Sequence, residues 1–84
     1  MIGRIVCSKA GRDKGYFMVV VAKENENYFV CDGKERPLQR PKRKNAKHLS
    51  FTNHTLQADD LNSNKKLKKA LAVFKNTADT KEEL

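Results

Sequence analysis

The highest density of charged side chains in this sequence is a run of cations between residues 34 and 47. Seven side chains there are basic and only Glu35 opposes them; the cations are Lys34, Arg36, Arg40, Lys42, Arg43, Lys44 and Lys47. Pro37 and Pro41 exclude a regular helix and keep the segment extended, which spaces the charges along the chain. Spaced cations neutralise successive phosphates and release condensed counterions. We expect a polyanion-binding segment. The alternatives are a solvated, solubilising face and a nuclear-localisation signal at residues 41–44, a short pattern that is common by chance.

A second candidate is the short glycine-containing loop from Lys9 to Gly15. Gly11 and Gly15 let backbone N–H groups come close to a phosphate, and Lys9, Arg12 and Lys14 supply charge. The spacing of a nucleotide-binding P-loop is absent. The plainer interpretation is a hairpin loop whose glycines take positive φ, and the two interpretations are compatible.

A third, weaker candidate lies at residues 63–66. Lys65 and Lys66 fall in the first turn of a predicted helix, where the helix dipole disfavours cations. A phosphate held there with Ser63 and Asn64 would explain them. Lys68 and Lys69 continue the basic face, so a solvated face is an equal alternative.

The charge balance supports an anionic partner. The chain has 84 residues, a formal charge of +8 and a pI near 9.7. Residues 1–50 carry a net +7 and residues 51–84 a net +1, so the anion-facing surface should lie in the first fifty. Such an excess favours nucleic acid, an anionic membrane or an acidic protein.

No apolar run approaches a membrane span or a signal-peptide core, so we expect a cytoplasmic protein with no membrane partner.

Enzyme chemistry has little support in the sequence. His48 and His54 are six apart, which suits no metal pair, and no nucleophile motif is present. We expect no catalytic residues, metal, cofactor or small-molecule substrate.

Tyr16 and Tyr28 are the only aromatics with polar tips that could stack on bases, and core packing is the expected role for both. Recognition should then be of phosphate and shape, favouring structured RNA.

The elements that must position these residues are short strands. Residues 2–8, 16–23, 28–32 and 48–51 have strand composition, and the second is apolar on both faces, which indicates the central strand. Four or five strands without intervening helices predict a mainly β fold, a small antiparallel barrel without exposed sheet edges, over residues 1–52. Cys7 and Cys31 are predicted to be small buried hydrophobic residues in strands, without a disulfide between them.

A helix should follow the barrel. Leu67, Ala70, Leu71 and Phe74 recur at helical spacing, which predicts an amphipathic helix over 63–76, capped by Ser63 or Asn62 and docked on the barrel. Residues 53–62 are predicted to be a polar linker and 77–84 a disordered tail.

Taken together, these segments resemble a known family. The string Gly3-Arg4-Ile5-Val6, then Ser8 to Gly15 and an apolar strand, resembles the KOW motif of ribosomal proteins and elongation factors. Residues 30–34, 40–49 and 63–71 extend the match to roughly residues 2–72. The chain resembles small bacterial KOW-domain RNA-binding proteins related to the fourteen-e family of large-subunit ribosomal proteins. Cys7 departs from the residue that many relatives have.

The resemblance implies an SH3-like barrel that binds RNA, which in the ribosomal relatives is ribosomal RNA of the large subunit. The positions that match are Gly11 and Gly15 in the loop, and Lys42, Arg43, Lys44, Lys47 and His48 in the basic stretch. We expect a ribosome-associated RNA-binding protein, with one surface from Arg12 and Lys14 to residues 40–47. Reversing Lys42, Arg43 and Lys44 should abolish binding without unfolding. The alternative is a protein-interaction module of the translation or transcription machinery.

Overall fold

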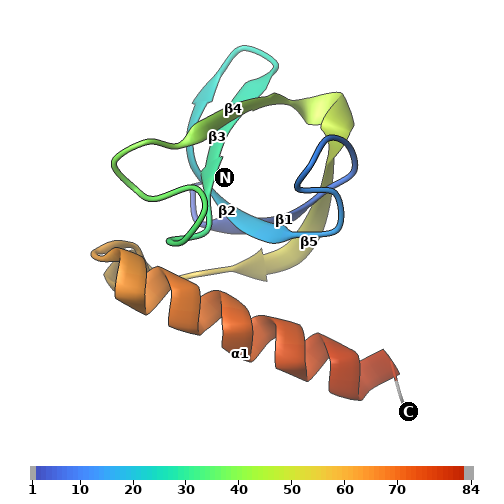
Figure 1. The fold of residues 1–84 in the computed structure, drawn as a ribbon, viewed down its shortest axis with the longest axis vertical. Helices are drawn as coiled ribbons and strands as arrows, with labels where there is room; N and C mark the ends of the chain where they lie inside the picture. Colours follow the sequence, from blue (N-terminus) through green and yellow to red (C-terminus); the bar gives the residue numbers. More distant parts are fainter. Residues whose placement is uncertain (1, 83–84) are drawn as a thin grey trace.

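The computed structural model describes residues 2–82, with the side chains of residues 2–76. Five antiparallel strands form one sheet in the order β4-β3-β2-β1-β5, and a single α-helix follows them (Figure 1). In chain order the elements are β1 (Arg4–Ser8), β2 (Phe17–Glu24), β3 (Asn27–Cys31), β4 (Lys42–Asn45), η1 (Ala46–His48), β5 (Leu49–Thr55), η2 (Ala58–Leu61) and α1 (Asn64–Glu82). The predicted mainly β fold with a C-terminal helix is confirmed.

The central position of the second strand is also confirmed. β2 is the middle strand, and each of its two faces contributes side chains to one of two apolar clusters. Met18 and Val20 face the concave side, where they pack with Tyr28 and Leu49. Val19 faces the other side. β2, in which apolar and polar residues do not alternate, is therefore buried on both faces, by the concave cluster on one side and by the second apolar cluster on the other.

The sheet curls into a ring around its concave cluster, consistent with a small SH3-like barrel (Figure 1). It does not close by hydrogen bonding: β4 and β5 remain edge strands, connected through η1. The predicted removal of sheet edges is therefore wrong. β4 begins directly after Pro41, which has no N–H to donate, and such a segment suits an edge.

The outer face of the sheet is covered by α1, as predicted. Leu67 and Leu71 are buried against Ile5, Val19 and Cys31. Phe74 makes an edge-to-face contact with Phe17, with ring centroids 5.2 Å apart. The hydroxyl of Ser63 accepts from the backbone N–H of Lys66 at 3.1 Å, so Ser63 is the helix cap. Within residues 2–82, no helix has the length and apolar character that a membrane span requires.

Two predicted boundaries are wrong. The segment predicted as a linker, 53–62, contains the end of β5 and the 3-10 turn η2, because Thr55 pairs with Arg4 and Leu56 and Leu61 pack under the helix. The helix continues to Glu82 instead of ending at residue 76. The sequence contains no Gly or Pro after residue 41, so no helix-breaking residue ends the helix earlier. The last two residues of the predicted tail, 83–84, lie outside the described residues.

Both cysteines are free and lie in strands, as predicted. Cys7 in β1 is half-buried and Cys31 in β3 is buried, so the predicted burial is confirmed for Cys31 only. β2 lies between these strands, which places the two cysteines about 10 Å apart, beyond the reach of a disulfide. Burial, with a smaller effect of Asp32, raises the pKa of the Cys31 thiol to about 11.

Candidate nucleic-acid interface

The loop between β1 and β2 is held by its own backbone. Gly11 and Gly15 take φ values of +84° and +88°, as their place in the loop predicts. The N–H groups of Lys14, Gly15 and Tyr16 donate to carbonyls of Gly11, Ser8 and Asp13 at 3.2, 2.8 and 2.9 Å. These three N–H groups are used inside the protein, so the predicted phosphate cradle would have to rely on the charged side chains of the loop.

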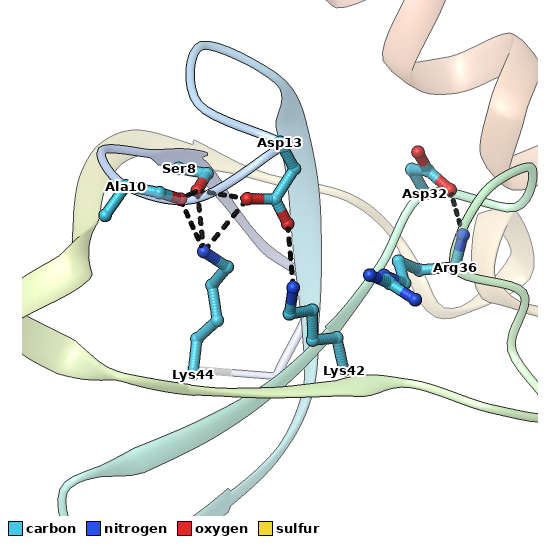
Figure 2. A network of polar contacts seen from close by, with 7 residues as sticks. All are labelled: Ser8, Ala10, Asp13, Asp32, Arg36, Lys42 and Lys44. Carbon is cyan, nitrogen blue, oxygen red and sulfur yellow. Dashed lines mark hydrogen bonds and ion pairs between the residues drawn. The ribbon is translucent and has the colours of Figure 1, made fainter.

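Lys44 joins this loop to β4 across the open side of the sheet (Figure 2). It stands opposite Tyr28 in the β3–β4 register, so its stem lies on the concave face. Its ammonium contacts Ser8 Oγ at 2.9 Å, the Ala10 carbonyl at 2.8 Å and Asp13 Oδ1 at 2.9 Å. An ammonium has three protons and Lys44 has three acceptors, so the group is fully satisfied. We call Ser8, Asp13 and Lys44 the loop clamp.

This geometry corrects the role predicted for Lys44. Its side chain is only 8% exposed, and a phosphate could reach it only by breaking the loop clamp. Reversal of Lys42, Arg43 and Lys44 together would therefore destabilise the fold, contrary to the prediction. Asp13 and Ser8 were missed by sequence reasoning, although one acid within a basic loop is a signal for an internal ion pair.

Asp13 is the acid of the clamp. Its carboxylate also accepts from the Ser8 hydroxyl at 2.8 Å, and the Lys42 ammonium lies 3.9 Å from Oδ2. Oδ2 is buried and makes no hydrogen bond with the described residues. Burial alone would raise the pKa of Asp13, but hydrogen bonds from Lys44 and Ser8 and the charges of Lys44 and Lys42 outweigh it and lower the pKa below 3.8.

Acid should therefore weaken the fold through Asp13. Because its pKa is lower in the folded chain, its stabilisation is present above about pH 4 and is lost as the pH falls through the folded value. We expect the melting temperature to fall more steeply below pH 4 in the natural protein than in an Asp13→Asn/Lys44→Met variant. Circular dichroism melts between pH 6 and pH 2 measure this, and parallel curves would contradict the role of Asp13.

Of the cations predicted to bind in the first fifty residues, apart from Lys42 and Lys44, Arg36 is half-buried and the others are exposed. Six of them lie on the β1–β2 loop, on β4 and on the segments beside it: Lys9, Arg12, Lys14, Arg40, Arg43 and Lys47. None of the six forms an ion pair with another residue in the described part of the chain. His48 is exposed beside them, and its carbonyl accepts from the N–H of Lys9 at 2.8 Å, which joins the loop to η1.

These residues do not all share one face. Lys42, a third exposed, turns inward toward Asp13 with Lys44. Successive strand residues point to opposite faces, so Arg43 between them points outward. The predicted single surface thus wraps around the edge strand β4.

The helix start lies elsewhere. In Figure 1, α1 begins at the side of the molecule opposite the β1–β2 loop. Asn64 there accepts from the Leu38 N–H at 2.7 Å and donates to Gln39 Oε1 at 2.9 Å. Lys66 pairs with Asp59 at 3.6 Å, while Lys65 is exposed. Ser63 and Asn64 are therefore used to cap the helix and to hold the β3–β4 loop at residues next to Arg40, and the helix start is separate from the β1–β2 loop.

The two tyrosines differ in environment. Tyr28 is 7% exposed and packs edge-to-face on Phe51, with centroids 5.1 Å apart, so its predicted core role is confirmed. Tyr16 is 53% exposed, so the core role predicted for it is wrong. It is the tyrosine that is accessible to a base.

Two further findings bear on function. Within the described residues, no group of three or more His, Cys, Asp or Glu side chains could hold a metal ion. No protein-family model matches the chain, and no curated protein matches its sequence.

Proposed function

We propose that this protein binds RNA through a basic surface, made of Lys9, Arg12, Lys14, Arg40, Arg43, Lys47 and His48. The observation that carries the proposal is the division among the basic residues near β4. Lys44 and Lys42 turn inward to Asp13, whereas the six cations of the basic surface are exposed and have no acidic partner among the side chains of residues 2–76. Exposed cations that lack acids are what phosphate binding requires.

Structured RNA, in particular ribosomal RNA of the large subunit, is the partner that we propose. The cations of the basic surface sit on a curled sheet, its loops and the short turn η1, and not on α1. This arrangement meets phosphates on a shaped surface and does not place a helix in a DNA groove. The resemblance to KOW-domain proteins points to the same partner. In this proposal the protein is a cytoplasmic, ribosome-associated factor without enzymatic activity.

Salt dependence tests the proposal. About six phosphate contacts predict that the logarithm of the association constant falls with the logarithm of salt concentration with a slope of roughly −4 to −5. Fluorescence anisotropy with a labelled RNA hairpin between 0.05 and 0.3 M KCl would measure it. A slope near zero would contradict phosphate binding and favour the alternative, a protein-interaction module that uses an apolar surface.

A further inference from the structure

Tyr16 stands between two hollows of the surface. The first has a volume of about 470 Å³ and lies between the β1–β2 and β3–β4 loops; it is lined by Arg12, Asp13, Tyr16, Met18, Asp32, Glu35 and Arg36. The second, about 340 Å³, lies between the sheet and α1; its lining includes Tyr16, Phe17, Asp32 and Leu71, with Lys34, Lys68 and Lys75. Both volumes fall within the range of small-molecule sites.

The two hollows differ in charge. In the first, two arginines face Asp32 and Glu35, since the third acid, Asp13, is already paired with Lys44 and Lys42. The charges of the first hollow therefore balance and a phosphate gains little there, whereas the Asp32 and Glu35 carboxylates can accept from the amino groups of a base. In the second, three lysines face one acid above an apolar floor that includes Phe17 and Leu71. Charge therefore favours a base in the first hollow and phosphates beside the second.

The walls of the first hollow are fixed by hydrogen bonds. The N–H of Tyr16 donates to the Asp13 carbonyl at 2.9 Å, and its carbonyl accepts from Ser8 at 3.0 Å. On the other wall, Asp32 Oδ1 accepts from the N–H groups of Lys34 and Arg36, each at 2.9 Å (Figure 2 shows the second bond). An exposed aromatic on a fixed backbone needs little ordering when a ring stacks on it.

We propose that the first hollow receives one unpaired nucleotide of the RNA, whose base stacks on Tyr16 between Arg12 and Arg36. The adjoining phosphates lie on Lys34, Lys68 and Lys75. The inference rests on the proposed function and refines it: the basic surface holds the structured RNA, and Tyr16 selects RNA with a bulged or looped-out nucleotide. Stacking tolerates any base, while the acids favour bases that carry an amino group.

Two hairpins of equal length test this, one fully paired and one with a single bulged 2-aminopurine nucleotide. We expect tighter binding of the bulged hairpin and quenching of its fluorescence by the natural protein. Tyr16→Ala should weaken binding of the bulged hairpin by about 5- to 150-fold, the range of one base–aromatic stack, and remove the quenching. Tyr16→Phe should keep both, and neither variant should change binding of the paired hairpin.

Lys68→Glu/Lys75→Glu supplies an independent check of the phosphate side. It should weaken binding of the bulged hairpin and make its salt slope shallower by about two. Equal binding of both hairpins by the natural protein, or unchanged quenching with Tyr16→Ala, would overturn the Tyr16 site while leaving the basic surface intact. Failure of the natural protein to bind either hairpin would overturn the proposed function itself. Circular dichroism verifies the fold of each variant.

Discussion

Replacing Lys44 with methionine should lower the free energy of unfolding by about 3–5 kcal/mol, the usual cost of removing one partner of a buried ion pair. Asp13 would remain 11% exposed, with only Lys42 at 3.9 Å to balance its charge. Domains of this kind have about 5–15 kcal/mol of stability in total. The melting temperature, measured by circular dichroism, should therefore fall by at least about 12 °C.

Two controls separate the loop clamp from a general loss of charge. Asp13→Asn/Lys44→Met removes both charges and keeps a partner for the Ser8 hydroxyl, so it should recover most of the lost stability. Lys42→Met removes a cation that is a third exposed, and should cost less than about 1 kcal/mol. If Lys44→Met melts within about 3 °C of the natural protein, the clamp does not stabilise the fold.

Reversing three exposed cations should nearly abolish RNA binding without unfolding the protein. Lys14→Glu/Arg43→Glu/Lys47→Glu changes one side chain each on the β1–β2 loop, β4 and η1, and all three lack an acidic partner among the described residues. Three lost phosphate contacts lower the affinity by about 100-fold or more at 0.15 M salt and reduce the magnitude of the salt slope by about three. Anisotropy with the paired hairpin would measure both.

The matched control lowers the net charge by the same amount elsewhere. Lys23→Glu/Lys65→Glu/Lys69→Glu changes exposed lysines on β2 and α1, outside the basic surface. This control should retain affinity within a few-fold, because screening limits the effect of distant charges. Equal loss in both triple variants would show that net charge, and not the basic surface, determines binding.

The fold could be predicted from the sequence where local pattern and burial agree. The apolar strand predicted at residues 16–23 is the buried central strand β2. Of the predicted helical stripe of Leu67, Ala70, Leu71 and Phe74, the structure packs Leu67, Leu71 and Phe74 against the sheet. The helix end at Glu82 could not be predicted, since the apolar stripe stops at Phe74 while the helical backbone continues without a stop signal. The open edges could not be predicted either: β4 and β5 are neighbours in the chain, joined only by η1, yet they lie at opposite edges of the sheet because β4 pairs with β3 and β5 with β1.

The sequence identifies the basic residues of the candidate site, but it does not show which of them point outward and which point into the fold. Lys42, Arg43 and Lys44 are adjacent cations with the same sequence signal, yet strand alternation turns Arg43 outward and the other two inward. Which face is inward depends on Asp13, 31 residues from Lys44, and no local pattern specifies that pairing. The accessibility of Tyr16 likewise follows from the packing of two loops and α1 around it.

The central claim, RNA binding through the basic surface, is tested most directly by ultraviolet cross-linking in the source cell, followed by sequencing of the attached RNA. The natural protein should give a sharp peak in large-subunit ribosomal RNA, and the Lys14→Glu/Arg43→Glu/Lys47→Glu variant should lose it while the Lys23→Glu/Lys65→Glu/Lys69→Glu control keeps it. Recovery of RNA at the same level with the natural protein and the first triple variant would contradict the claim.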